Sequence, residues 1–177
     1  MSEMNEFFGE NIPMATQGYT AEQWQARQDS KWTMVQMILA PLQLLTFVIS
    51  LGLIIYYLTT GNGYLIATVS VFIKIALLWA ITITGMFWEH DVYGKWFLAE
   101  EFFWEDFMNA VALGMHNLYF IALMLGWSEQ DLMWLMLVAY ISYLVNFGQF
   151  LVRGLQSRKQ REAFQDIDGM QVVEGQA

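Results

Sequence analysis

Residues 32–58 read WTMVQMILAPLQLLTFVISLGLIIYYL and contain no charged side chain. A helix that crosses the hydrocarbon core of a membrane, about 30 Å thick, needs about 20 consecutive apolar residues. This run exceeds that length, and Pro41 within it is expected to kink the helix. The stretch therefore predicts a first transmembrane helix.

Three further stretches, all C-terminal to this run, are also long and mostly apolar. They are residues 64–88, with one charge at Lys74, residues 107–126, with His116, and the uncharged residues 132–152. The chain is 56% hydrophobic and only 14% charged, whereas soluble domains have about 25% charged residues. We therefore predict an all-α fold, an integral membrane four-helix bundle within residues 20–158. The acidic tails, 1–19 and 159–177, are predicted to be disordered.

The distribution of basic residues predicts how the helices cross the membrane. An even number of spans places both tails and the loop 89–106 on one side. That side holds every basic residue outside the second span: Arg27, Lys31, Lys95, Arg153, Arg158, Lys159 and Arg161. Because Lys and Arg are enriched in cytoplasmic loops, we predict that both termini face the cytoplasm.

Composition also excludes several classes of function. The chain has no cysteine, so it can form no disulfide, thiolate metal site or thiol nucleophile. Its formal net charge of −9 leaves no basic face for nucleic-acid phosphates. A small four-helix exporter is disfavoured as well, because such exporters typically place an acid in the first helix, and residues 32–58 have none.

Polar side chains within the predicted spans need partners there, because lipid cannot satisfy them. Lys74 and His116 are ionisable at membrane depth, which makes both of them functional candidates. At 100° per residue, Asn109 shares a helix face with Glu105 and His116. The fourth span has a comparable polar stripe, which consists of Ser142, Asn146, Gln149 and Arg153. The alternative is that these groups only hydrogen-bond the helices to one another.

The densest cluster of acids is in the loop between the second and third spans. Glu89 begins this loop and Glu105 and Asp106 end it, so the returning chain is expected to bring them together. Trp88 and Trp104 flank them. Crowded carboxyl groups beside aromatic surface hold a proton more readily than isolated ones, which provides a general acid near neutral pH. The alternatives are a solvated acidic loop or a divalent-cation site, although no metal-ligand spacing is recognisable.

Several short motifs, most of them around this loop, carry a family resemblance. They are TGMFWE at 84–89, VYG at 92–94, FFWED at 102–106 and LAPLQ at 39–43, with His116 followed by Tyr119, and Asn146 followed by QFL at 149–151. Over roughly residues 19–158, the chain resembles the 3-vinyl bacteriochlorophyllide hydratases of phototrophic bacteria. The Trp-Glu and Phe-Trp-Glu-Asp motifs are fairly specific.

The resemblance implies a hydro-lyase of bacteriochlorophyll biosynthesis. Such an enzyme adds water to the C3 vinyl group of a chlorophyllide or bacteriochlorophyllide and forms a 1-hydroxyethyl group. A magnesium chlorin would be the substrate or bound pigment, and no organic cofactor is required. The implied location is the bacterial inner or intracytoplasmic photosynthetic membrane. Other pigment-synthesis enzymes or photosynthetic complexes are the further partners to expect.

Hydration of a vinyl group needs a general acid, a group that orients water and a dry pocket for a flat ring. The expected catalytic residues are Glu89, Glu105, Asp106 and His116, the last as a base or as a ligand of the pigment magnesium. The expected pigment-binding residues are Trp88, Trp104, Asn109, Asn146, Gln149, Arg153 and Lys74. Arg153 or Lys95 is the cation expected to bind the propionate group of the pigment.

Two questions stay open at this point. The sequence does not assign the roles of acid and base among the carboxyl groups. A non-catalytic pigment-binding or assembly subunit of a photosynthetic complex, derived from the same family, is the alternative function.

Overall fold

The computed structural model of the chain describes residues 20–174, which are largely helical. The helices are α2 (Ala21–Asp29), α3 (Lys31–Thr60), α4 (Tyr64–Tyr93), the short 3-10 helix η1 (Glu100–Phe102), α5 (Phe103–Met124) and α6 (Glu129–Glu174). The predicted all-α fold is therefore confirmed. The predicted tail 1–19 lies outside the described residues.

Four helices are long and apolar enough to cross a membrane, namely α3, α4, α5 and the part of α6 from Glu129 to Leu155. They coincide with the four predicted spans and differ from them only near the ends. The end of the chain differs more. α6 continues to Glu174, so residues 159–174 are helical where the sequence predicted a disordered tail. This segment has no proline and is rich in good helix formers, so it extends a helix that the membrane span has already nucleated.

Local signals explain where the helices begin and end. Thr20 and Gln23 form a capping box at the start of α2: Thr20 Oγ1 accepts from the Gln23 amide at 3.2 Å, and Gln23 Oε1 accepts from the Thr20 amide at 3.0 Å. Gly61 ends α3 and Gly94 ends α4 with φ angles of 71° and 72°. Glycine adopts this left-handed conformation without steric strain.

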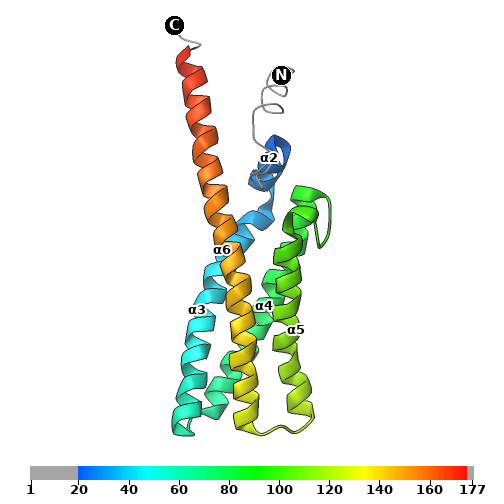
Figure 1. Cartoon of the computed structure of the whole chain (residues 1–177), viewed down its shortest axis with the longest axis vertical. Coiled ribbons are helices and arrows are strands. Elements are labelled where there is room, and N and C mark those ends of the chain that lie inside the picture. Colours follow the sequence, from blue (N-terminus) through cyan, green and yellow to red (C-terminus); the bar gives the residue numbers. More distant parts are fainter. Residues whose placement is uncertain (1–19, 175–177) are drawn as a thin grey trace.

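The chain folds as two helical hairpins, α3 with α4 and α5 with α6, and the helices pack mainly within each hairpin. The tight turns of both hairpins lie at one end of the bundle (Figure 1). The helix α2 and the connection between α4 and α5 lie at the other end, which we call the α2 end. The described part of the chain thus begins near the α2 end, where α6 also leaves the bundle.

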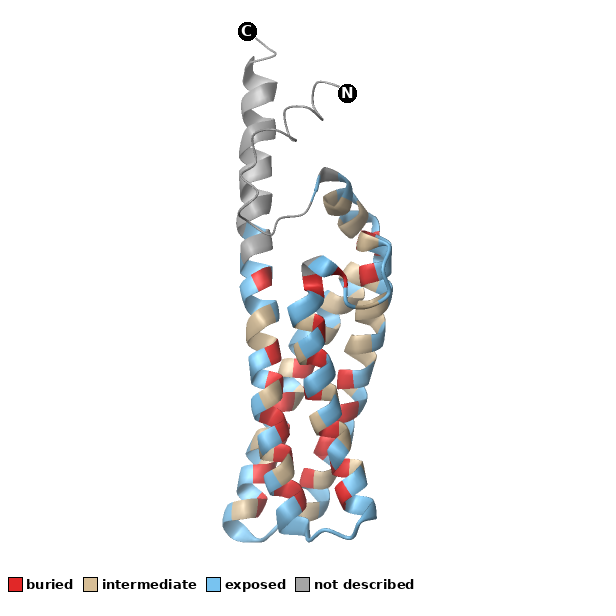
Figure 2. Cartoon of the chain, turned by 45° about the vertical axis from the view of Figure 1, so that its right-hand side comes forward, coloured by how far each residue is buried: buried red, intermediate tan, exposed pale blue. Residues whose placement is uncertain are grey.

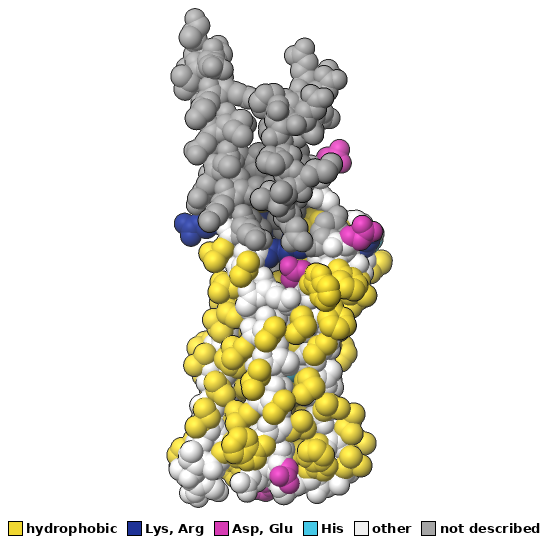
Figure 3. Space-filling view, in the orientation of Figure 1, with side chains coloured by type: hydrophobic (Ala, Val, Ile, Leu, Met, Phe, Trp, Pro, Cys, Tyr) yellow, Lys and Arg dark blue, Asp and Glu magenta, His cyan; other side chains and the backbone are white. Residues whose placement is uncertain are grey.

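The surface of the bundle is apolar over most of its length. Buried residues recur along all four long helices (Figure 2), and they include small ones such as Ala67 and Ala112, which allow the helices to approach closely. Large apolar side chains such as Ile66 and Ile121 are exposed on the outside and form a broad belt (Figure 3). Soluble proteins rarely expose so much apolar surface, so this belt suits contact with lipid.

The half of the bundle nearer the hairpin turns is closely packed. Ile54 and Met133 are fully buried there. A polar cluster ties three helices together, since the Tyr140 hydroxyl donates to Ser50 Oγ at 2.6 Å and Ser50 and Ser70 are 2.8 Å apart. In the half nearer the α2 end, the hairpins leave a pocket between them.

Candidate active site

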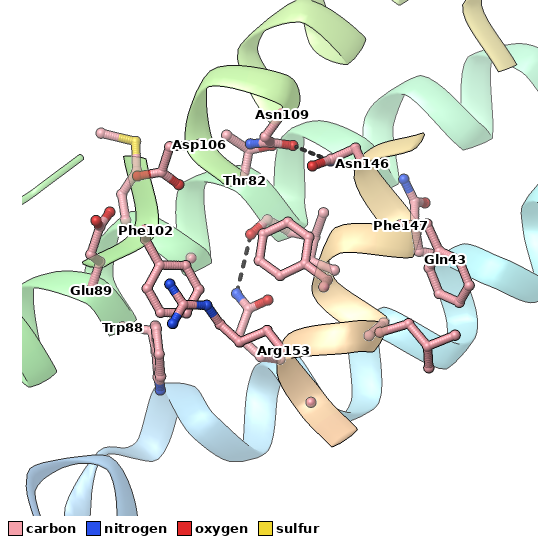
Figure 4. A pocket seen from close by; sticks show the side chains of 18 of the residues that line it. Gln43, Thr82, Trp88, Glu89, Phe102, Asp106, Asn109, Asn146, Phe147 and Arg153 are labelled. Carbon is pink, nitrogen blue, oxygen red and sulfur yellow. Dashed lines mark hydrogen bonds between the residues drawn. The ribbon is translucent and has the colours of Figure 1, made fainter. Parts of the chain in front are cut away.

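The pocket has a volume of about 460 Å³ and lies between the two hairpins near the α2 end (Figure 4). Most of its lining is apolar or aromatic. Its polar side chains are Arg27, Thr33, Gln36, Gln43, Thr82, Glu89, Asp106, Asn109, Asn146 and Arg153. An apolar pocket of this size with a few convergent polar groups is the usual form of a small-molecule site.

The pocket brings together only part of the predicted site. The predicted residues that line it are Trp88, Glu89, Asp106, Asn109, Asn146 and Arg153. The predicted residues outside its lining are Lys74, Trp104, Glu105, His116 and Gln149.

Glu89 and Asp106 form a buried carboxyl pair at the pocket wall, with exposed fractions of 3% and 8%. Glu89 is near the end of α4, and Asp106 is in the first turn of α5. The Ala99 amide donates to Glu89 Oε1 at 2.8 Å, and the Leu98 amide donates to Asp106 Oδ2 at 2.7 Å. The side chains of Glu89 and Asp106 also interact with each other. Two adjacent buried carboxyl groups cannot both be ionised without a large cost, so we infer that the pair shares a proton.

The backbone that caps this pair is strained. Leu98 has a φ of 55°, and among the described residues it is the only non-glycine with a positive φ. This conformation costs about 1–3 kcal/mol and persists only where the surrounding structure holds it. Because the Leu98 amide binds Asp106, we infer that the loop 94–99 positions the carboxyl pair.

Arg153 on α6 is held from two sides. Its Nε donates to Glu105 Oε1 at 3.0 Å, and its guanidinium carbon is 3.8 Å from the centre of the Phe102 ring. Arg153 Nη2 is buried and has no hydrogen-bond partner among the described residues. Glu105 therefore orients Arg153, and the guanidinium retains a donor for a ligand in the pocket.

Lys74 and His116 lie further from the α2 end and are fully buried. Lys74 Nζ is 3.3 Å from the centre of the Tyr143 ring and 2.8 Å from the oxygen of Gln43, once this amide is oriented to accept. Lys74 therefore reaches the pocket only through Gln43 and Tyr143, which line it. His116 Nδ1 is 2.7 Å from the Ala112 carbonyl oxygen, to which it donates. A contact between His116 and the pigment stays a prediction.

The remaining predicted residues, Trp104 and Gln149, are not part of the pocket lining. Trp104 is 64% exposed and packs edge-to-face on Phe107 at the outer surface, a position that suits an interfacial aromatic belt. Gln149 is half-buried, and its contact with pigment also stays a prediction. The sequence-based prediction missed Phe102 and Gln43 as lining residues, although both lie within the motifs FFWED and LAPLQ.

The fold and the pocket together define a class of protein. Four apolar helices, a mostly apolar pocket and a pair of adjacent buried carboxyl groups are the features of a membrane-embedded enzyme of acid–base chemistry. Comparison with known proteins gives the family. The 2-vinyl bacteriochlorophyllide hydratase family matches residues 19–156, and the chain belongs to that family. Its 2-vinyl group is the 3-vinyl group of the resemblance above, which is thereby confirmed.

Two relatives carry the same name, 2-vinyl bacteriochlorophyllide hydratase. The one from Cereibacter sphaeroides is 46% identical over 147 residues, which cover 83% of this chain and 92% of the relative. The one from Rhodobacter capsulatus is 44% identical over 142 residues, which cover 80% and 83%. No solved structure matches the chain. The chain is thus a hydro-lyase that hydrates the vinyl group of a bacteriochlorophyllide in bacteriochlorophyll biosynthesis.

Proposed function

We propose that the pocket binds the pigment with its C3 vinyl group against Glu89 and Asp106, and that this pair performs the proton transfers of hydration. The observation that carries the proposal is the pair of adjacent, buried carboxyl groups at the wall of a mostly apolar pocket. Protonation of an alkene needs an acid that still carries its proton near neutral pH, and a shared proton meets that need.

The reaction balances with these two groups, the pigment and water. The protonated carboxyl group transfers its proton to the terminal vinyl carbon, which becomes a methyl group. The positive charge then lies on the carbon next to the ring, where the macrocycle delocalises it. A water oxygen bonds to that carbon, and one water proton restores the carboxyl group. Because no electron is gained or lost, we propose that no organic cofactor takes part.

We propose further that Arg153 binds the propionate of the pigment. A bacteriochlorophyllide is a free acid, and the unpartnered Nη2 of Arg153 is a charged donor at the pocket wall. Trp88, Phe102 and Phe147 line the same pocket and offer aromatic surface to the flat ring.

Incubation of the purified protein with bacteriochlorophyllide in D2O tests the proposed proton transfer. We expect conversion of the vinyl to the 1-hydroxyethyl pigment by chromatography, with one solvent-derived deuterium in the new methyl group by NMR. A new methyl group without solvent deuterium would contradict transfer from an acid that exchanges with water.

We propose that both termini face the cytoplasm and that the hairpin turns face the periplasm. The described basic residues outside α4 lie towards the α2 end, and cytoplasmic loops are enriched in Lys and Arg. Reporter fusions at Gly61 and Ser128 should therefore read as periplasmic, and a C-terminal fusion as cytoplasmic. A cytoplasmic reading at Ser128 would rule out this orientation.

The apolar surface of the bundle also indicates which membrane holds the protein and which partners it meets there. The apolar belt suits the inner or intracytoplasmic photosynthetic membrane. We propose that other enzymes of pigment synthesis or photosynthetic complexes meet the chain in that membrane.

A further inference from the structure

A directional chain of hydrogen bonds links α4, α5 and α6 at the pocket wall. The Thr82 hydroxyl donates to the Leu78 carbonyl oxygen at 2.8 Å, so its own oxygen is left to accept. Asn109 Nδ2 donates to this hydroxyl at 3.0 Å, and Asn146 Nδ2 donates to Asn109 Oδ1 at 3.3 Å (Figure 4). The reverse link, from Thr82 to Asn109 Oδ1, is longer at 3.4 Å. These hydrogen bonds therefore all run in one direction, from Asn146 through Asn109 and Thr82 to Leu78. This leaves Asn146 Oδ1 as the remaining acceptor.

Asn146 Oδ1 is an acceptor without a partner. Asn146 is 4% exposed and lines the pocket, and its Oδ1 is buried with no hydrogen-bond partner among the described residues. An unpaired buried acceptor is destabilising, so the working complex is expected to supply a partner. That partner must bring an O–H or N–H group, because a carboxamide oxygen can only accept.

The pigment substrate offers no such donor. Vinyl, carbonyl and carboxylate groups have no hydrogen to donate, and the ring nitrogens of a magnesium chlorin bind the metal. Water has O–H groups, and so does the hydroxyethyl group of the product. We infer that Asn146 Oδ1 binds the water molecule that adds to the vinyl group. This inference, which makes Asn146 a catalytic residue, rests on the function proposed for Glu89 and Asp106.

The hydrogen-bonded residues Thr82, Asn109 and Asn146 are well placed to hold the reacting water. Asn109 follows Asp106 by one turn of α5, so both lie on the same helix face and line the pocket. The water held by Asn146 keeps one O–H bond, which points at Oδ1. Its oxygen forms the bond to the cationic carbon, and its other proton goes to the carboxylate that gave up a proton. The new hydroxyl group then donates to Asn146 in place of the water, while Thr82 and Asn109 act as positioning residues.

The variant Asn146→Leu separates the two steps of the reaction in D2O. Without bound water, the pigment cation returns a proton to the carboxylate more often than water adds to it. Because the acid exchanges with D2O, the recovered vinyl pigment gains deuterium at its terminal carbon. We expect hydration to fall about 10- to 100-fold, while deuterium exchange into recovered vinyl pigment continues. NMR of the terminal vinyl hydrogens measures exchange, and chromatography measures hydration.

Asn117→Leu is the matched control. Asn117 is a half-buried asparagine of α5 that lies outside the pocket lining, and its carboxamide donates to the Leu113 carbonyl oxygen at 2.8 Å and accepts from Trp79 at 3.3 Å. This variant should keep both rates.

Two results with Asn146→Leu overturn the inference: exchange and hydration fall in equal proportion, or neither falls. If this variant no longer binds pigment, Thr82→Val decides the question, because it removes the hydroxyl that sets the direction of the chain. Thr82→Val must then raise the ratio of deuterium exchange to hydration, and an unchanged ratio overturns the inference. The proposed function fails separately, if Asp106→Asn leaves both rates unchanged.

Discussion

Asp106→Asn and Glu89→Gln are each expected to slow hydration by about 10²–10⁴-fold, the usual loss when a general acid or base is removed. Both changes keep the shape of the side chain and an oxygen that can accept from the Leu98 or Ala99 amide, so the fold should survive. Neither variant can hold the shared proton as the pair does. Chromatography of the converted pigment gives the rate, and the absorbance of bound pigment shows that affinity is kept.

Glu100→Gln is the control for this prediction. Glu100 is in the same connection, but its side chain is 93% exposed and pairs with Lys95. Its replacement should leave the rate unchanged. The double variant of Glu89 and Asp106 should be little slower than the slower single variant, because two groups that share one proton act as a unit. If both single variants hydrate the pigment at the wild-type rate, the carboxyl-pair mechanism is wrong.

Arg153→Gln is expected to weaken binding of the free-acid pigment by about 10- to 100-fold, since a hydrogen bond to a charged group contributes about 1.5–3 kcal/mol. The physical reason is the buried Nη2, which the Phe102 ring and Glu105 hold at the pocket wall. The methyl ester of the pigment has no carboxylate, so wild type and variant should bind it alike. Titration of pigment absorbance with each form measures both affinities.

In Arg153→Gln, Glu105 loses its ion-pair partner. The double variant Arg153→Gln with Glu105→Gln removes both charges of the pair and keeps the comparison of acid with ester. Lys95→Gln is the matched control, because Lys95 is a cation in the connection between α4 and α5 whose side chain is 48% exposed and outside the pocket lining. Equal loss of affinity for acid and ester in the Arg153 variants would contradict a carboxylate site.

The sequence by itself determined the four membrane helices. A long apolar run is a local property, and its length alone decides whether it can cross a bilayer. The run 32–58 lies within α3, and the other three predicted spans likewise correspond to helices. The C-terminal segment 159–174 could not be predicted in this way, because a polar run that follows a span can either separate from the helix or extend it.

The carboxyl site was only partly readable from the sequence. The returning loop predicted that Glu89 would meet the acids at the start of the third span, and it does meet Asp106. Neighbouring residues on a helix point about 100° apart, so the rotation of α5 decides which acid enters the pocket. Packing against α4 and α6 turns Asp106 towards Glu89 and Glu105 towards Arg153.

The partners of the buried polar groups were decided only by the tertiary structure. The sequence shows that a polar side chain at membrane depth needs a partner, but it does not show which neighbouring helix supplies one. Lys74 meets the amide of Gln43 and the ring of Tyr143, and among the described residues no carboxylate pairs with it. Asn146 meets Asn109 across the α5–α6 hairpin, and its oxygen has no hydrogen-bond partner within residues 20–174. These pairings depend on how the helices are rotated and how the two hairpins pack, which is a property of the whole bundle.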